Sequence, residues 1–483
     1  MTLLHATDIS VSDGATRLLD PVSLRLEPGE PLIILGETGS GKSLLAQAIM
    51  GTLPDSLNAA GQVSIGTRHL RAGADRAAFR RLWGREIAVL PQEPWLSLDP
   101  LMRAGAQVAD AHRLVRGLPR AQARQQASTD LVAFGLGGAA IASYPHELSG
   151  GMAQRVAIAA ARAGGAPIVI ADEPTKGLDA ARRNDVAALL LGELGQGGGL
   201  MVITHDLALA RMIGGRLIVL REGAVVETGT TADVFANPQA AYTRDLIAAD
   251  PEHWPERETA ASVGETVLRT QGLTLSRRGQ VLIDGLDLTL QRGRILGVTG
   301  PSGCGKSSLG DALLGLLPPD AGQVVRAPEL APTACQKLYQ DPVAAFARKR
   351  TLGQTLADVA RLHRAPAGQI ETLLARLRLD PALLSRRPDA VSGGELQRLA
   401  LLRAMLARPR FLFADEPTSR LDPITQRDVI MMLAGLAREE GLSITLVSHD
   451  AALIAKVADD MLQFAQPRPD TAGLRDSGKA MVA

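Results

Sequence analysis

The sequence contains one eight-residue pattern twice, and this repetition constrains the fold more than any other feature. Residues 36–43 read GETGSGKS and residues 300–307 read GPSGCGKS, so both match G-x-x-x-x-G-K-[ST], a phosphate-binding loop. Each copy follows an apolar run, Pro31–Leu35 or Ile295–Thr299, which we interpret as a buried parallel strand. The first copy precedes a helical pattern, Leu44–Met50. A strand, a glycine-rich loop and a helix start predict a phosphate site, because their N–H groups donate to anions.

The two copies and the length together predict two domains. Their lysines lie 264 residues apart in a chain of 483 residues, which suits two large domains rather than one. We expect an α/β fold with two tandem P-loop NTPase domains. Each should have a mixed, mainly parallel sheet, a helical subdomain and a small antiparallel β part. The predicted boundaries are residues 1–250 for the first domain, 251–264 for a linker, 265–466 for the second domain, and 467–483 for a disordered tail.

Composition excludes several classes of protein. The 52 basic and 51 acidic residues leave a net charge of +1, which gives no global attraction to nucleic acid. Two cysteines are too few for a disulfide framework and fit a reducing compartment. We find no secretory signal at the N-terminus and no apolar run of the 18 or more residues that a membrane helix needs. Any membrane span must therefore come from a partner.

Polar residues follow the predicted strands of the first half. Gln92 ends one apolar run, Asp172 and Glu173 end a second, and His205 ends a third. Ligands of open parallel sheets bind beyond the carboxyl ends of the strands, so these side chains should share a site with the P-loop. Residues 103–145 have helical spacing and predict the helical subdomain, after which Ser-Gly-Gly begins another helix. Taken alone, each of these signals also fits an ordinary loop residue, strand-end carboxylate or helix cap.

The second half repeats these signals in the same order. Gln340 follows a strand, Ser392 opens a Ser-Gly-Gly helix start, Asp415-Glu416 ends a strand, and His449 ends the next. The Ser-Gly-Gly serine precedes the first acid by 23 residues in both halves. A Leu-Asp pair also follows the acids in each half, at Asp179 and Asp422. Six motifs thus recur in one order at nearly constant spacing, which leaves little room for the separate structural explanations.

This motif set resembles the ATPase domain of the ABC family, once in each half. The resemblance implies a head-to-tail pairing in which the P-loop of each domain and the Ser-Gly-Gly of the other enclose one ATP, with Mg²⁺. The implied catalytic residues are Glu173, Glu416, His205, His449, Gln92 and Gln340. The implied ATP-binding residues are Gly36, Glu37, Thr38, Gly39, Ser40, Gly41, Lys42, Ser43, Gly300, Pro301, Ser302, Gly303, Cys304, Gly305, Lys306, Ser307, Ser149, Gly150, Gly151, Ser392, Gly393 and Gly394. The implied Mg²⁺ residues are Ser43, Gln92, Asp172, Ser307, Gln340 and Asp415.

The chain departs from the family pattern in two places. Val391 stands where the signature usually has leucine, and neither half shows the aromatic residue that commonly stacks on adenine. How adenine is held therefore stays open. Both halves keep a lysine, a glutamate and a histidine, which implies two competent sites.

Two segments resemble one subgroup of the ABC family in particular. Residues 92–100, QEPWLSLDP, are similar to the Q-loop of ATPases from oligopeptide, dipeptide and nickel importers, and residues 235–246 are similar to the segment after their core. The resemblance implies an ATP-hydrolysing subunit, peripheral on the cytoplasmic side of the inner membrane, with two permease subunits and an extracytoplasmic solute-binding protein. It does not name the solute, which could be a peptide, nickel or another compound.

Three other functions stay open for the same motif set. One is the fused ATPase of a vitamin or cobalt importer. The second is a ribosome-associated tandem ABC protein, against which the short linker and the balanced charge argue. The third is the ATPase of a soluble carbon–phosphorus lyase complex, which only its partners would distinguish.

Overall fold

The protein is described here from a computed structural model. It places residues 2–92, 94–175, 178, 180–255, 264–277, 279–301, 303–328, 330–419 and 421–464. The chain divides into two compact units, Met1–Ala248 and Ala249–Ala483. Most of the predicted linker, residues 256–263, and the whole predicted tail, 467–483, lie outside the described residues.

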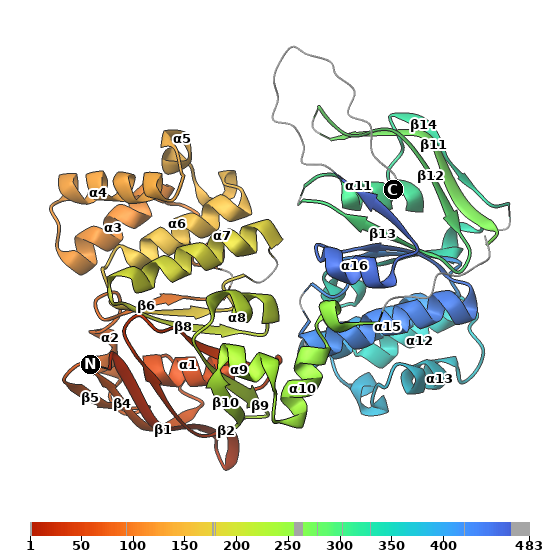
Figure 1. The fold of residues 1–483 in the computed structure, drawn as a ribbon. Helices are drawn as coiled ribbons and strands as arrows, with labels where there is room; N and C mark the ends of the chain where they lie inside the picture. Colours follow the sequence, from red (N-terminus) through yellow and green to blue (C-terminus); the bar gives the residue numbers. More distant parts are fainter. Residues whose placement is uncertain are drawn as a thin grey trace. The chain divides into compact units, whose positions relative to one another are not determined.

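The core of the first unit is a six-stranded sheet in the order β10-β9-β3-β8-β7-β6 (Figure 1). All neighbours pair in parallel except β9 and β10. The strands are β3 (Leu32–Leu35), β6 (Ile87–Leu90), β7 (Ile168–Asp172), β8 (Gly199–Thr204), β9 (Arg216–Arg221) and β10 (Ala224–Thr230). β3 and β8 are buried along their full length, as expected for parallel strands covered on both faces.

A second, antiparallel sheet of the first unit has the order β2-β1-β4-β5. Its strands are β1 (Leu4–Asp13), β2 (Thr16–Leu26), β4 (Asn58–Ile65) and β5 (Arg68–Arg71). In Figure 1 it lies at the opposite end of this unit from helices α3, α4 and α5. The helices of the unit are α1 (Lys42–Met50), α2 (Arg76–Arg80), α3 (Ala104–Arg116), α4 (Arg120–Ala133), α5 (Gly138–Ala142), α6 (Gly150–Arg162), α7 (Ala180–Leu191), α8 (Leu207–Ile213), α9 (Thr231–Ala236) and α10 (Ala241–Ala248).

The second unit repeats this architecture. Its parallel sheet has the order β15-β16-β17-β13-β18, and its antiparallel sheet has the order β12-β11-β14. The strands are β11 (Thr266–Arg277), β12 (Gln280–Gln291), β13 (Ile295–Thr299), β14 (Ala321–Arg326), β15 (Cys335–Leu338), β16 (Phe411–Asp415), β17 (Ser443–Val447) and β18 (Asp460–Gln463). The helices are α11 (Lys306–Leu314), α12 (Leu352–Leu362), α13 (Gln369–Arg376), α14 (Gly393–Met405), α15 (Pro423–Glu440) and α16 (Ala451–Val457).

The predicted α/β class, with tandem P-loop domains and a helical part in each half, is therefore confirmed. Within residues 52–86, a stretch that reads from the sequence as loop-rich and then mixed, β4 pairs with β1 along most of its length. No helix among the residues with described placement is long and apolar enough to cross a membrane.

Trp254 shows where the second unit begins. Its side chain is 3% exposed and belongs to the hydrophobic core of the second unit. Its indole Nε1 donates to the carbonyl of Ala249 at 3.1 Å, which satisfies the one polar group of a buried tryptophan. The described beginning of the predicted linker is thus packed structure.

Candidate functional site

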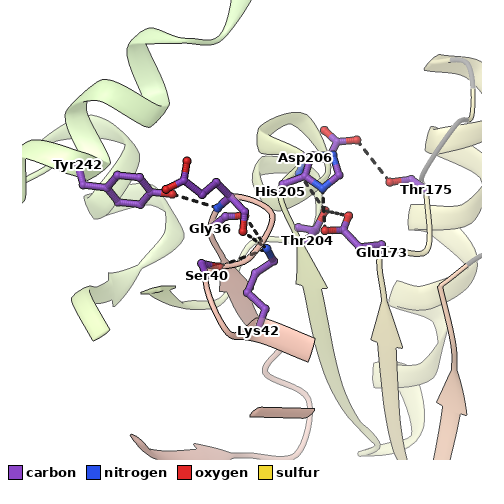
Figure 2. A network of polar contacts seen from close by, with 10 residues as sticks. Gly36, Ser40, Lys42, Glu173, Thr175, Thr204, His205, Asp206 and Tyr242 are labelled. Atoms are coloured by element: carbon purple, nitrogen blue, oxygen red, sulfur yellow. Dashed lines mark hydrogen bonds and ion pairs between the residues drawn. The ribbon is translucent and has the colours of Figure 1, made fainter. Parts of the chain in front are cut away.

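The P-loop of the first unit joins β3 to α1. Gly41 adopts a left-handed conformation at φ 97° immediately before the helix, which favours glycine. Lys42 is 6% exposed, and its ammonium donates to the carbonyls of Gly36 and Glu37, each at 2.7 Å. Figure 2 shows this lysine pointing into its own loop. The loop oxygens therefore fix a positive charge at the place where phosphates would bind.

The second P-loop has the same construction. Gly305 is left-handed at φ 110°, and Lys306 donates to the carbonyls of Gly300 and Pro301 at 2.8 and 2.9 Å. Cys304 is buried within this loop, and burial raises the pKa of its thiol despite the opposing charge of Lys306. Ser302 lies outside the described residues.

The sheet register brings the predicted acids to the edge that carries the P-loop. Asp172 at the end of β7 pairs with Ile203 of β8, and Thr204 of β8 pairs with Leu35, the last residue of β3. The following glutamates, Glu173 and Glu416, both have left-handed backbones, at φ 49° and 47°. Such a conformation costs about 1–3 kcal/mol for a non-glycine residue and concentrates at functional sites. Its presence in both halves therefore points to a function.

Each glutamate is joined to the predicted histidine of its own half. His205 Nδ1 lies 2.7 Å from Glu173 Oε1, and His449 Nε2 lies 2.6 Å from Glu416 Oε1. Thr204 also donates to Glu173 at 3.4 Å. Figure 2 shows the first pair side by side at the strand ends.

The electrostatics of the first pair favour its charged form. Burial alone would raise the pKa of Glu173, but the charge and hydrogen bond of His205, together with the charge of Lys42, lower this pKa below its ordinary value. Burial likewise would lower the pKa of His205, and Glu173 raises it above its ordinary value. The Glu173 carboxylate is therefore kept deprotonated.

The two predicted glutamines differ. Gln340 donates through Nε2 to Glu416 Oε2 at 2.9 Å, so the second half joins glutamine, glutamate and histidine in one network. Gln92 is exposed two residues beyond β6, and its side chain makes no hydrogen bond to another described residue. The sequence pattern is thus the same while the contacts differ.

The predicted metal-binding oxygens lie at the same edge. Ser307, in the first turn of α11, lies beside Asp415 at the end of β16. Burial raises the pKa of Asp415, and the Ser307 hydroxyl and the charge of Lys337 only partly offset this. Ser43 and Asp172 hold the equivalent positions in the first half, at the start of α1 and the end of β7.

The two Ser-Gly-Gly motifs begin helices, as predicted. Ser149 accepts a hydrogen bond from the N–H of Met152 at the start of α6, and Ser392 accepts one from the N–H of Glu395 at the start of α14, each at 3.3 Å. Glu395 also accepts from the Ser392 N–H, which completes a capping box. The hydrogen bonds that these two serines make to described residues are local to their own helix starts.

Two contacts near the P-loops, one in each unit, were not expected from the sequence. Lys337 of β15 lies 2.8 Å from Asp311 and 3.8 Å from Asp415, with 12% of its side chain exposed. The hydroxyl of Tyr242 accepts a hydrogen bond from the N–H of Glu37 in the first P-loop, at 3.0 Å. The place of Lys337 within the strand that leads to Gln340 was a usable signal for the first contact. No local pattern reveals the second, which spans 205 residues.

A P-loop lysine, a strand-end acid and a glutamate–histidine pair at the carboxyl edge of a parallel sheet define a P-loop ATPase, here present twice. The family model described as ABC transporter matches residues 19–176 and 283–419, once in each half. The chain belongs to the ABC transporter family. It is an ATP-binding chain of that family whose ATP hydrolysis is coupled to transport.

Two curated relatives match nearly the whole chain. The peptidoglycan transport ATP-binding protein YejF of Agrobacterium fabrum (strain C58 / ATCC 33970) is 34% identical over 495 residues, covering 95% of this chain and 90% of the relative. The glutathione import ATP-binding protein GsiA of Escherichia coli (strain K12) is 32% identical over 500 residues, covering 90% and 80%. Tandem domains over this full length are thus shared with ATP-binding proteins of transport systems.

A solved structure that matches most of the chain shows the same fold. The archaeal ribosome recycling factor aABCE1, solved in complex with the ribosomal stalk protein aP1, matches with a TM-score of 0.65. The match covers 92% of this chain and 84% of that chain at 20% identity, so it shows the fold alone.

Proposed function

We propose that this chain is the fused ATP-binding subunit of an importer of the peptide/nickel type, peripheral on the cytoplasmic side of the inner membrane. It would bind two permease subunits and act with an extracytoplasmic solute-binding protein. The observation that carries this proposal is a complete lysine, glutamate and histidine set in each half of one chain. The near full-length relatives named for peptidoglycan transport and glutathione import favour import of a peptide-like solute.

The residues of each site support hydrolysis by direct attack of water on the γ-phosphate. Lys42 and Lys306 would balance the negative charge that spreads over the phosphate oxygens, together with loop N–H groups. Glu173 and Glu416 would orient the water and accept its proton. His205 and His449 hold these carboxylates in place, so that no large rearrangement is needed at the moment of reaction.

The oxygen atoms beside each P-loop fit Mg²⁺. Ser307 at the start of α11 and Asp415 at the end of β16 place a hydroxyl beside a carboxylate, and Mg²⁺ prefers such ligands together with substrate phosphates. Ser307, Asp415 and Gln340 would hold the ion in the second half, and Ser43, Asp172 and Gln92 in the first. When bound, Mg²⁺ neutralises charge on the phosphates.

We infer from the family resemblance that each ATP also contacts the Ser-Gly-Gly of the other half. Lys42 would then share a site with Ser392, and Lys306 with Ser149. This pairing can be tested by double variants, because changes within one site fail to add whereas changes in separate sites add. Lys42→Ala should leave nothing further for Ser392→Ala to remove in nucleotide binding, whereas Ser149→Ala should cause a further loss. The opposite pattern would overturn the pairing.

The transport role is tested by the partners of the full chain. We would tag the chain, separate membranes, ribosomes and soluble complexes, and identify co-purifying proteins by mass spectrometry. Two permeases in the membrane fraction would support the importer. The genes beside those of the permeases would then separate peptide, nickel, vitamin and cobalt systems. Recovery with ribosomes or with a soluble lyase complex would overturn the transport role and leave the ATPase chemistry intact. The same purification with Glu173→Gln, which should retain ATP, would capture the partners of the ATP-bound chain.

A further inference from the structure

One aromatic side chain from outside the ATPase core reaches the first P-loop. Tyr242 lies on α10, in the segment that follows the last strand of the first unit, and is 5% exposed. Its hydroxyl accepts the hydrogen bond from the N–H of Glu37, and Figure 2 shows the ring directed at the loop from a separate helix.

The contact acts on the peptide unit that also binds the P-loop lysine, Lys42. The N–H of Glu37 and the carbonyl of Gly36 belong to one peptide, and Lys42 donates to that carbonyl at 2.7 Å. The N–H and C=O of a trans peptide point in opposite directions, so Tyr242 and Lys42 hold this unit from two sides. A rotation of the peptide would break both hydrogen bonds and move the lysine.

Helix α10 and the two residues before it are held against strands β9 and β10 of the first unit. The carboxylate of Glu227 on β10 accepts hydrogen bonds from the N–H groups of Gln239 and Ala240, at 2.7 and 3.0 Å. The Arg221 guanidinium of β9 lies 5.1 Å from the centre of the Tyr242 ring. Because β9 pairs directly with β3, the strand that leads into the P-loop, these contacts fix the hydroxyl relative to the loop.

In the second P-loop the equivalent peptide, Gly300–Pro301, does not need a tyrosine to hold it. Pro301 stands at the position of Glu37, so this peptide has no N–H to satisfy, and the proline ring restricts its φ. Lys306 still binds the carbonyl of Gly300, at 2.8 Å. The three tyrosines of the chain are Tyr144, Tyr242 and Tyr339, so none follows the last strand of the second unit.

We propose that Tyr242 is a positioning residue for the first ATP site alone, and that residues 239–248 therefore set the ATP affinity of this site. The hydroxyl keeps the Gly36–Glu37 peptide, and with it Lys42, in the arrangement that receives phosphate. The proposed role of Tyr242 rests on ATP binding at the P-loops and does not depend on the proposed role in transport.

The test uses the full chain with one site disabled at a time. With Lys306→Ala, binding of a fluorescent ATP analogue reports the first site, and there Tyr242→Phe should raise the Kd about fivefold, the worth of one neutral hydrogen bond. With Lys42→Ala, the same Tyr242→Phe change should leave the Kd of the second site unchanged. In the chain with both lysines, KM for ATP should rise while kcat stays within about twofold, because the hydroxyl touches the loop and not the reacting atoms.

A rescue distinguishes positioning from loss of packing. Glu37→Pro copies the second loop and removes the N–H, so Tyr242→Phe should cost nothing further in that background. Conversely, Pro301→Glu should weaken the second site by a similar factor, and this arm does not require Glu37→Pro to fold. An unchanged Kd in Tyr242→Phe, an equal loss at both sites, or full additivity with Glu37→Pro would each overturn the proposal.

Discussion

The imidazole of His205 meets the carboxylate of Glu173 through Nδ1 at 2.7 Å, on a glutamate whose backbone is left-handed. The equivalent pair in the second half, His449 and Glu416, meets through Nε2 at 2.6 Å. The glutamate backbone is thus reproduced between the halves while the histidine ring is turned. The carboxylate position is therefore the shared requirement, and it is the first target for mutation.

Replacing the glutamates by glutamine should stop chemistry without stopping binding. Glu173→Gln and Glu416→Gln remove the proton acceptor but keep the size and shape of the side chain, so each single variant should lose the turnover of its own site, and in the double variant kcat should fall by at least about a hundredfold. ATP binding by calorimetry should stay at the parental affinity. Hydrolysis at the parental rate in both single variants would show that neither glutamate has the assigned role.

Each P-loop lysine should be required for the binding of one ATP. Lys42→Ala removes a charge held by two loop carbonyls, and Lys306→Ala removes its counterpart. Calorimetric titration with ATP should therefore fall from two sites to one in either variant, and to none in the double variant. A stoichiometry that stays at two in the single variants would contradict the assignment.

Lys337 should stabilise the second unit. It is largely buried between Asp311 and Asp415, so Lys337→Met leaves Asp415 without its cation. We expect a loss of about 1–3 kcal/mol in the free energy of unfolding, measured by denaturant titration. Lys349→Met, at an exposed position, is the matched control and should change little. Equal stability in the two variants would show that the ion pairs contribute nothing.

The attachment of α10 should loosen in acid. Burial alone would raise the pKa of Glu227, but the hydrogen bonds from the N–H groups of Gln239 and Ala240 lower this pKa below its ordinary value. A lowered folded-state pKa contributes stability above the unfolded-state value and loses it as pH falls through the folded-state value. Hydrogen exchange across 239–248, corrected for intrinsic rates, should therefore accelerate below about pH 4.5.

Glu227→Gln separates this effect from general acid unfolding. The variant lacks the titrating group, so its exchange over 239–248 should be faster already at pH 6 and change less on acidification. Glu222→Gln, with an exposed side chain, should behave as the parent. A parental pH profile in Glu227→Gln would mean that this carboxylate does not hold the helix.

The sequence predicted those parts of the fold and the site that depend on neighbouring residues in the chain. Strand-end residues such as Asp172 and His205 could be placed at one edge because parallel strands align their carboxyl ends. Pairing of β4 with β1 was not predictable, because the first five residues of β4, 58–62, are small or polar and only Val63 and Ile65 give an apolar signal. The contact between Tyr242 and Glu37 depends on how α10 packs, which no local pattern encodes. Gln92 and Gln340 share a motif, yet only Gln340 hydrogen-bonds to its glutamate.

The burial of Trp254 decides where this chain can be divided for separate expression. A cut after the polar stretch, at residue 264, would strip the second half of an indole that fills its core and expose apolar surface, a known cause of aggregation. A cut between Ala248 and Ala249 leaves both α10 with the first half and Trp254 with the second. The predicted linker thus includes the first packed part of the second half.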